Sequence, residues 1–426
     1  MRVLFAANPH KSIFQYMAPM AWALRTAGHE VRFASLPRFA DVITQAGLTA
    51  VPVGRRQNPA RLLELADPAL LAKSRAGLPT PWDVAEDPSK ATWEYLSNGY
   101  GLATGSLRED NFPMIGELVE FARHWKPDLV VWEPFTYAGA IAAEAVGAAH
   151  ARLLFGIDVF GVAREHFLRV RAQQPEGERS DPLAEWLGGY ARKFGGEYTE
   201  SMAVGHFTID QFPESLQTRA PGLRYEPVQF IPYGGPATVP SWLWKQPEKP
   251  RVALTMGLSA TEVYDGYTID TRDVLDSLAD LDIELVATIA DSEKAALGPV
   301  PGNVRLVPYA PIHHLAPTCS AFIHHGGAAT LATVARHAVP HLSLTYHWDQ
   351  PMLGRLITGQ GAGLDMHTSE ATGENVRAAV RRLLDEPRFT ERAAALRDET
   401  LALPTPNQLV ARIEELTTRH RDESRG

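Results

Sequence analysis

Residues 322–330 bring together the groups that can hold a phosphate. An apolar run ends in His324 and His325, the glycines Gly326 and Gly327 follow, and an alanine-rich helical pattern begins immediately after them. This order is typical of a strand, a tight turn and the start of a helix. A helix start presents unpaired backbone N–H groups and the positive end of the helix dipole, and glycine lets the backbone approach a ligand closely. The segment therefore predicts a phosphate or pyrophosphate site.

Strand and helix patterns alternate in both halves of the chain and must position this turn. In the first half, strands are expected at 2–7, 31–35, 48–53, 128–132 and 151–155, with helices at 17–26 and 136–146. In the second half, strands are expected at 252–256, 283–289, 304–307, 321–324 and 342–345, with helices at 271–279, 328–337, 375–401 and 407–418. The segment 55–115 has many prolines and glycines and a less regular pattern. Such alternation is typical of α/β domains with a parallel sheet covered by helices.

A proline-rich segment divides the chain into two such domains. We predict a Rossmann-like N-terminal domain at 1–225, a linker at 226–250, a second Rossmann-like domain at 251–403, and a C-terminal helix at 404–426 that returns to the first domain. Ligands of open α/β sheets bind at the carboxyl ends of the strands. The cleft between the domains would therefore hold both the turn after His324 and the turn after the first strand.

Charge and composition exclude several classes of partner. The chain has 426 residues, a formal net charge of −9 and no basic stripe, so we expect no nucleic-acid partner. Its most hydrophobic region is interrupted by Glu144, His150 and Arg152, so we expect no membrane span. The apolar run at the start is too short for the core of a signal peptide. The only cysteine, Cys319, rules out an internal disulfide and fits the reducing cytoplasm, where we place the protein.

The order of motifs along nearly the whole chain resembles one group of enzymes. The turn 324–327, followed by 348–350 and 361–363, resembles that of the GT-B glycosyltransferases, which use nucleotide sugars. The segments 19–31, 132–139, 181–187 and 254–259 resemble one subgroup, the antibiotic macrolide and anthracycline deoxysugar transferases, such as the desosaminyl and mycaminosyl transferases. The segment 55–115 resembles this subgroup least.

The resemblance implies a reaction and its partners. Members of the subgroup transfer a deoxysugar from a dTDP-sugar to a hydroxyl of a polyketide aglycone, with inversion, and a helix N-terminus takes the place of a metal, so no metal or other cofactor is expected. Several members need an activator protein that resembles a haem-less cytochrome monooxygenase, and a homodimer is left open. The apolar N-terminal half, with Phe14, Tyr16, Met17 and 93–95, favours a large hydrophobic acceptor.

The resemblance also carries over a site for the donor diphosphate. The residues expected there are His324, Gly326, Gly327, Ala328, Ala329, Thr330, Gly257 and Ser259. His324 would contact the diphosphate, and the backbone N–H groups of 328–330 would complete the cradle. The family commonly has glycine where Ala329 stands, and alanine does not tolerate a positive φ, so the cradle can differ there.

Two further segments are expected to hold the rest of the donor. Pro308 and Ile312 belong to a loop that matches the nucleobase loop of the family. Trp348, Asp349 and Gln350 resemble its sugar-binding segment, in which a carboxylate and an amide accept and donate hydrogen bonds to neighbouring hydroxyls. Asp349 also suits the N-cap of a helix, and both roles can hold.

The catalytic base is the largest departure from the family pattern. The family usually has a histidine where Ile13 stands, and its acidic partner corresponds to Glu133. Three alternatives stay open: Glu133 acts as the base itself, His10 in the same loop replaces the missing histidine, or the protein is a non-catalytic homologue that binds a partner transferase or its donor. A nucleotide-sugar epimerase of the same fold is a further alternative. Asp280 and Asp282 precede a strand and more simply form a solvated turn than a metal site.

Overall fold

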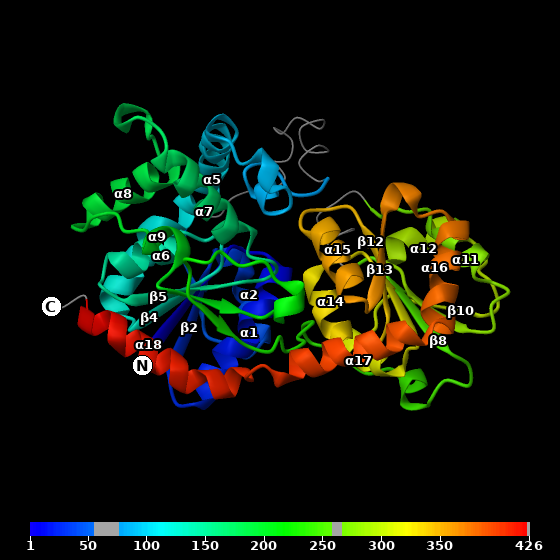
Figure 1. The fold of residues 1–426 in the computed structure, drawn as a ribbon. Helices are drawn as coiled ribbons and strands as arrows, with labels where there is room; N and C mark the ends of the chain where they lie inside the picture. Colours follow the sequence, from blue (N-terminus) through cyan, green and yellow to red (C-terminus); the bar gives the residue numbers. More distant parts are fainter. Residues whose placement is uncertain (55–75, 258–265, 424–426) are drawn as a thin grey trace.

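The computed structural model describes residues 1–54, 76–257 and 266–423, and within them two parallel sheets form two domains (Figure 1). The first sheet has the order β3-β2-β1-β4-β5-β6-β7, and the second has the order β10-β9-β8-β11-β12-β13. The strands of the first sheet are β1 Arg2–Ala6, β2 Glu30–Ser35, β3 Ala50–Pro52, β4 Leu129–Trp132, β5 Ala149–Leu153, β6 Phe207–Asp210 and β7 Tyr225–Pro227. Those of the second are β8 Arg251–Thr255, β9 Glu284–Thr288, β10 Val304–Val307, β11 Ala321–His324, β12 His341–Thr345 and β13 Gly363–His367.

Helices cover both faces of each sheet. The described helices of the first domain are α1 Lys11–Thr26, α2 Ala40–Gln45, α5 Trp93–Trp125, α6 Ala138–Glu144, α7 Val159–Ala172, α8 Pro182–Phe194 and α9 Ser201–Val204. The rest are α11 Thr271–Ser277, α12 Asp291–Leu297, α13 Ile312–Leu315, α14 Ala328–Ala335, α15 Gln350–Gln360, α16 Gly373–Asp385, α17 Pro387–Ala402 and α18 Pro406–Glu423. Short 3₁₀ turns join them, among them η2 Trp82–Ala85 and η5 Glu214–Leu216. Among the described helices, none combines the length and apolar character that crossing a membrane requires.

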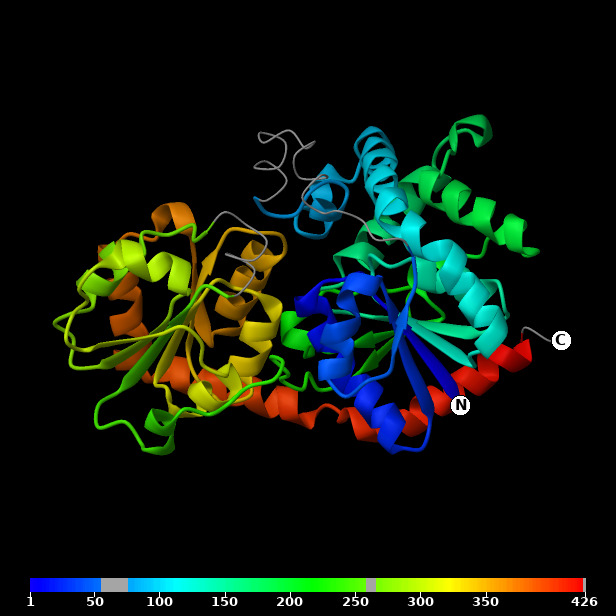
Figure 2. The ribbon, with the colours of Figure 1, turned by 180° about the vertical axis from the view of Figure 1, so that it is seen from behind.

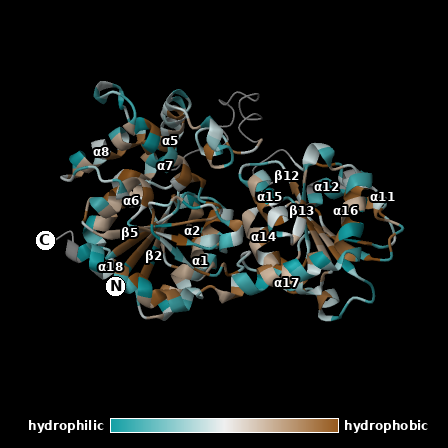
Figure 3. Cartoon of the chain, in the orientation of Figure 1, coloured by the Kyte–Doolittle hydropathy of each residue, from teal (hydrophilic) through white to brown (hydrophobic). Residues whose placement is uncertain are grey.

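The central strands are apolar on both faces because helices cover both. Four consecutive side chains of β1, from Val3 to Ala6, are fully buried, and the same holds for 321–324 in β11. Figure 3 shows hydrophobic residues on the strands inside both domains and hydrophilic residues on the outer helices. This is the pattern of buried parallel strands, and it explains why the expected strands 2–7, 252–256 and 321–324 lie where the sequence placed them.

Helix α5 departs from the sequence expectation. The segment 55–115 was expected to be irregular, yet α5 runs without interruption from Trp93 to Trp125. Four glycines and a proline weaken its helical pattern, but Leu96, Tyr100 and Leu107 lie on one buried face. Burial of this face offsets the low intrinsic propensity, which sequence reading alone underestimates.

The expected helical run 375–401 is two helices. α16 ends at Asp385 and α17 starts at Pro387. Proline lacks the N–H group that would continue the first helix and suits the first turn of the next one. The break lets α16 and α17 pack on the second domain in different directions.

The end of the chain crosses from one domain to the other. α17 packs against α14 and α16 of the second domain, whereas α18 packs against α1 and β5 of the first. Figures 1 and 2 show α17 and α18 running along one side of both domains. At the crossing, Gln229 donates to the carbonyl oxygens of Leu401 and Leu403 at 2.9 and 2.6 Å. The domains are therefore joined at two places in the sequence.

The two domains also contact each other directly along the cleft. One buried apolar cluster contains Phe160 of the first domain together with Leu331 of α14 and Leu353 of α15. The Gly77 N–H donates to the Tyr346 carbonyl at 2.8 Å. These contacts bring the loops at the carboxyl ends of both sheets face to face.

Candidate active site

Three neighbouring strands of the second sheet end in the loops expected at the donor. Gly257 follows β8, His325 follows β11, and the loop 346–349 follows β12. Because β8, β11 and β12 are adjacent in the sheet, segments that are far apart in the sequence meet at one edge. A Cβ atom at Gly326 would lie 3.3 Å from Cβ of Gln350, so the turn and the sugar-binding segment are in contact.

The two histidines of the turn have different surroundings. His324 is fully buried; its Nδ1 accepts from the Gly326 N–H at 3.0 Å, and its Nε2 lies 3.0 Å from Nδ1 of His341. Burial lowers the pKa of His324 well below its usual value, and His341 and His325 lower it further. Both ring nitrogens are engaged inside the domain in this structure, where they hold the turn, and the expected contact between His324 and the diphosphate stays a prediction.

The ring of His325 lies beside the turn, packed against two of the glycines expected at the donor. Its ring lies between Gly257 and Gly327: a Cβ at Gly257 would be 2.5 Å from its Cε1, and one at Gly327 would be closer still to its Nε2. Only glycine leaves room for this ring on both sides. Its Nδ1 is buried and has no hydrogen-bond partner among the described residues. Burial, and then His347, lower the pKa of His325 to about 4, so the ring is neutral near pH 7.

The start of α14 forms an open cradle. Gly326 has a φ of +78° and Gly327 is the N-cap. In the described structure no side chain caps α14, and its first turn contains no acidic residue. The first backbone N–H groups, from Ala328, Ala329 and Thr330, therefore keep the orphan donors of a helix start. Ala329 lies in the helix, so alanine is compatible with the backbone there.

The loops around this cradle have no cationic side chain. Residues 256–270, 325–327 and 346–349 contain neither lysine nor arginine. From these segments, the groups available to an anion are backbone N–H groups, the helix dipole and neutral hydrogen-bond donors.

The sugar-binding segment lies at the start of α15. Trp348 has a φ of +48°, which is rare for a residue with a large side chain. The Gln350 side-chain oxygen accepts from the N–H groups of Tyr346 and His347 at 3.2 and 2.9 Å, so only its amide N–H groups are left for a ligand. Asp349 stands at the N-cap position of α15 as expected, but its side chain makes no capping hydrogen bond to the helix.

Asp349 faces the other domain instead. Its side chain is 8% exposed, and burial raises its pKa to about 7, although the amide of Ile157 lowers it by a hydrogen bond. A carboxyl group that titrates near neutral pH at the contact of two domains is typical of functional sites.

The nucleobase loop lies at the edge of the same sheet. Pro308 and Ile312 flank the connection from β10 to α13, and they are exposed and half-buried, respectively. Strand β10 is the outermost strand, two strands away from β8, so a base here would extend outward from the cradle. Ser259, the other residue expected at the diphosphate, lies outside the described residues.

The loop after β1 carries the two residues considered for the base position. His10 is exposed to solvent at the N-cap of α1. Protein atoms around its ring exclude part of the water and lower its pKa, and the charge of Arg38 lowers the pKa further. Ile13 lies in the first turn of α1 with 7% of its surface exposed. An aliphatic side chain cannot accept a proton, so nothing at this position replaces the histidine of the family.

Glu133 joins the loop after β1 to the loop after β4. It is fully buried, and its oxygens accept from the N–H groups of Asn8 and Phe135 at 3.3 and 2.8 Å and from the Thr136 hydroxyl. Burial raises its pKa to about 7, against the effect of these hydrogen bonds. Among the described residues no hydrogen bond links Glu133 to His10, so the structure does not pair them.

Aromatic side chains of both domains meet beside Asp349. The ring of Trp348 lies 5.4 Å from Trp82, 5.6 Å from Phe135 and 6.2 Å from Phe160, and Phe155 lies 5.7 Å from Phe135. All except Phe160 are half-buried. This cluster offers apolar surface next to the donor segment.

The sequence pointed to other residues for an apolar acceptor. Phe14 and Met17 are core residues, and Trp93 packs against Phe167 at 5.8 Å. Phe155 and Phe160 were not predicted, because a sequence does not show which aromatic residues of the two domains meet. His325 was missed although it stands in the motif, since the direction of each ring depends on partners as distant as His341.

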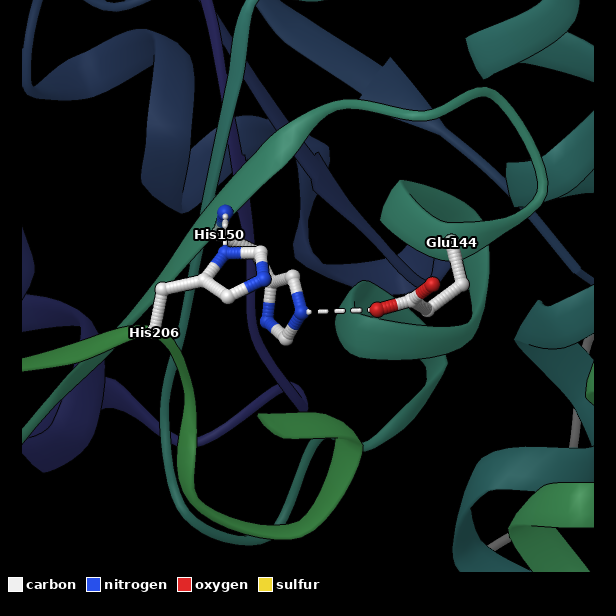
Figure 4. A group of neighbouring side chains, drawn as sticks. All are labelled: Glu144, His150 and His206. Atoms are coloured by element: carbon white, nitrogen blue, oxygen red, sulfur yellow. Dashed lines mark hydrogen bonds and ion pairs between the residues drawn. The ribbon is translucent and has the colours of Figure 1, made fainter. Parts of the chain in front are cut away.

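One group outside the cleft has residue types that can bind a metal. Glu144, His150 and His206 lie together on the first domain (Figure 4). His150 Nδ1 accepts from the Trp132 indole N–H at 3.2 Å, so its Nε2 carries the proton and donates to Glu144 at 3.3 Å. The Nδ1 of His206 accepts from the His150 N–H at 3.1 Å. These nitrogens already serve structural hydrogen bonds, so the group does not fit a metal site.

The two acidic residues before β9 form ion pairs. Asp280 pairs with Arg377, and Asp282 pairs with Lys249.

Comparison with known families gives matches over most of the chain. Residues 22–257 match the family described as erythromycin biosynthesis protein CIII-like, N-terminal domain, and residues 272–416 match its C-terminal domain. Two relatives are 10-deoxymethynolide desosaminyltransferase of Streptomyces venezuelae, 43% identical, and aclacinomycin-T 2-deoxy-L-fucose transferase of Streptomyces galilaeus, 40% identical. The matches cover 99% of this chain and 98% and 97% of those proteins.

A solved structure confirms the fold expected from the resemblance. The glycosyltransferase VinC, in complex with dTDP, superposes with a TM-score of 0.87 at 36% identity, over 98% of this chain and 100% of that one. The two facing parallel-sheet domains are therefore the GT-B fold.

The raised pKa of Glu133 predicts the sign of one pH effect. Its folded-state pKa of about 7 lies above the ordinary value of 4.5, so between these values the native state holds a proton that the unfolded chain releases. Its contribution to stability therefore falls as pH rises through this interval. Glu133→Gln does not titrate and should lack this part of the pH dependence. Chemical unfolding of both proteins from about pH 5 to about pH 8 measures it; a difference in unfolding free energy that does not change with pH would contradict the assignment.

Proposed function

Since the chain belongs to the erythromycin biosynthesis protein CIII-like family and is a glycosyltransferase of the GT-B fold, we propose that it moves a deoxysugar from a dTDP-sugar to a hydroxyl of a polyketide aglycone. The observation that carries this proposal is the open helix start at α14 with His325 beside it. This arrangement suits a diphosphate. The printed names of the relatives support the same donor and acceptor classes.

The leaving group departs without a metal in this proposal. The negative charge on the diphosphate grows as its bond to the sugar breaks, and preorganised N–H groups stabilise charge that develops in the transition state. Ala328, Ala329 and Thr330 supply such groups, and neutral His325 supplies one more polar ring atom. The absence of lysine and arginine from the surrounding loops assigns this task to the backbone.

The sugar transfer proceeds with inversion in a single displacement. The acceptor oxygen attacks the anomeric carbon from the face opposite the diphosphate, the new C–O bond forms as the bond to the diphosphate breaks, and the hydroxyl proton passes to a base. His10 is our choice for this base, because it is exposed in the loop at the carboxyl end of β1, just before Ile13, which cannot accept a proton. Glu133 keeps both oxygens engaged with the two loops, so it holds the loop of His10 in place.

The acceptor lies against the aromatic cluster formed by Trp82, Phe135, Phe155, Phe160 and Trp348. A polyketide aglycone is large and apolar, and aromatic faces bury such a ligand without demanding a particular hydrogen-bond pattern. The cluster joins both domains, so a bound acceptor would sit next to the donor sugar.

Partners and location complete the proposal. An activator protein and a homodimer remain predictions from the resemblance, as does a cytoplasmic location. The non-catalytic alternative suggested by Ile13 is not favoured, since the full-length relatives are named as transferases.

A transfer assay tests the proposed function. Purified protein, dTDP-deoxysugars and macrolide or anthracycline aglycones are incubated together, with and without a candidate activator, and glycoside is detected by mass spectrometry. We expect glycoside and free thymidine diphosphate in equal amounts. The anomeric carbon of the glycoside should have the configuration opposite to that of the donor. A change in the sugar when the donor is incubated without an acceptor would favour an epimerase. No glycoside in any combination would contradict the proposal.

The assignment of the base predicts a large effect on turnover. His10→Ala should lower kcat about 100-fold or more, because the proton acceptor is lost, and should leave the KM for the donor nearly unchanged. His166→Ala is the matched control, since His166 is a half-buried histidine of α7 that contacts Arg169. Steady-state kinetics measure both variants. Full turnover in His10→Ala would remove His10 from the mechanism.

The two histidines of the turn should behave differently when removed. His325→Ala should raise the KM for the donor about 10-fold or more while the fold stays intact, because a polar ring packed beside the cradle is lost. His324→Ala should instead lower stability by about 1–3 kcal/mol, because it leaves buried partners in the turn and in β12 unpaired. Donor kinetics and thermal unfolding separate the two. The reverse pattern would restore His324 to the donor site.

A further inference from the structure

The loop between β5 and α7 reaches from the first domain into the donor site. A Cβ atom at Gly156 would lie 2.5 Å from Oδ2 of Asp349 and 3.8 Å from Cβ of Ala328. Gly156 thus touches the sugar-binding carboxyl group and stands in ordinary contact with the start of the cradle. The neighbouring Ile157 N–H donates to the same carboxyl group.

Buried polar contacts fix this loop on its own domain. Asp158 accepts from Arg152 at 2.6 Å and from the Tyr225 hydroxyl at 2.7 Å, and both members of the ion pair are at most 1% exposed. The Gln217 side chain accepts from the Asp158 N–H at 2.9 Å and donates to the Gly156 carbonyl at 3.4 Å. Paired charges buried this deeply resist displacement, so the loop is a rigid support.

A second buried group of the first domain interacts electrostatically with the same carboxyl group. Tyr16 of α1 is 3% exposed, and its hydroxyl has no hydrogen-bond partner among the described residues. Burial, and then the charge of Asp349, raise the pKa of Tyr16 well above its usual value. A buried hydroxyl without a partner is costly unless a ligand or water satisfies it. The hydroxyl of Tyr16 is therefore a buried polar group that a ligand can satisfy, within the electrostatic influence of Asp349.

We propose that Gly156 and Tyr16 of the first domain complete the donor-sugar subsite, with Gly156 acting as a positioning residue for the Asp349 carboxyl group and the Tyr16 hydroxyl as a contact for the sugar. This inference rests on the proposed role of Asp349 in holding the sugar. It assigns the recognition of the sugar to both domains. Glycine is required at 156 because any side chain would displace the carboxyl group.

The test compares Gly156→Ala with the wild-type protein and with Gly222→Ala, a control at which a Cβ meets nothing within 4 Å. We expect Gly156→Ala to raise the KM for the dTDP-sugar about 10-fold to about 100-fold, since hydrogen bonds between the sugar and a carboxylate are lost. The inhibition constant of thymidine diphosphate should stay within about threefold, because the contact of Gly156 with the cradle is loose. Gly222→Ala should match the wild type in both.

A mutant cycle separates positioning from a general structural role. Asp349→Asn should raise the donor KM by itself, and adding Gly156→Ala to it should cause little further change, because both substitutions remove the same interaction. Tyr16→Phe, which keeps the ring, should raise the donor KM without affecting thymidine diphosphate inhibition. It also keeps the test decisive if Gly156→Ala fails to fold.

Several outcomes would overturn the inference. One is an unchanged donor KM in both Gly156→Ala and Tyr16→Phe; another is an equal loss of sugar and thymidine diphosphate affinity in Gly156→Ala. A third is full additivity in the mutant cycle. A wild-type protein that transfers no sugar would instead count against the proposed function, so the two failures are distinguishable.

Discussion

In the proposed reaction, a departing diphosphate is stabilised at a helix start whose flanking second-domain loops, 325–327 and 346–349, contain neither lysine nor arginine. The start of α14, which no side chain caps in the described structure, presents N–H groups and the positive end of the helix dipole there. Burial favours the neutral forms of the other groups: it lowers the pKa of His325 to about 4 and raises the pKa of Asp349 and of Glu133 to about 7. A site with these properties is poor at holding free charge and depends on fixed dipoles, which need no reorganisation during the reaction.

The fold serves this requirement by bringing two sheet edges together. Parallel strands end at one edge, so β8, β11 and β12 deliver the turn and the sugar-binding segment, while β1, β4 and β5 deliver His10, Glu133 and Gly156. The crossing of α17 and α18 and the shared apolar cluster join the domains. The carboxyl group of Asp349 is the point at which both halves meet.

Much of this arrangement follows from local sequence patterns. The buried strands are continuous apolar runs, and the turn 324–327 combines glycines with the helix that follows it. The resemblance supplied the fold and the reaction class, which the relatives support. What sequence could not supply depends on contacts between distant residues. The different surroundings of His324 and His325 depend on His341. The length of α5 depends on a buried face, whose burial offsets the low helix propensity of its glycines. The importance of Gly156 depends on the carboxyl group of Asp349, 193 positions away in the sequence.

Calorimetric titration with thymidine diphosphate, carried out in the presence of a chelator such as EDTA, tests the central claim most directly. If backbone N–H groups of α14 hold the diphosphate, binding should be detected and its affinity should be the same with the chelator as with added Mg²⁺. Binding that disappears on chelation, or a protein that releases no heat with the nucleotide under either condition, would contradict the account.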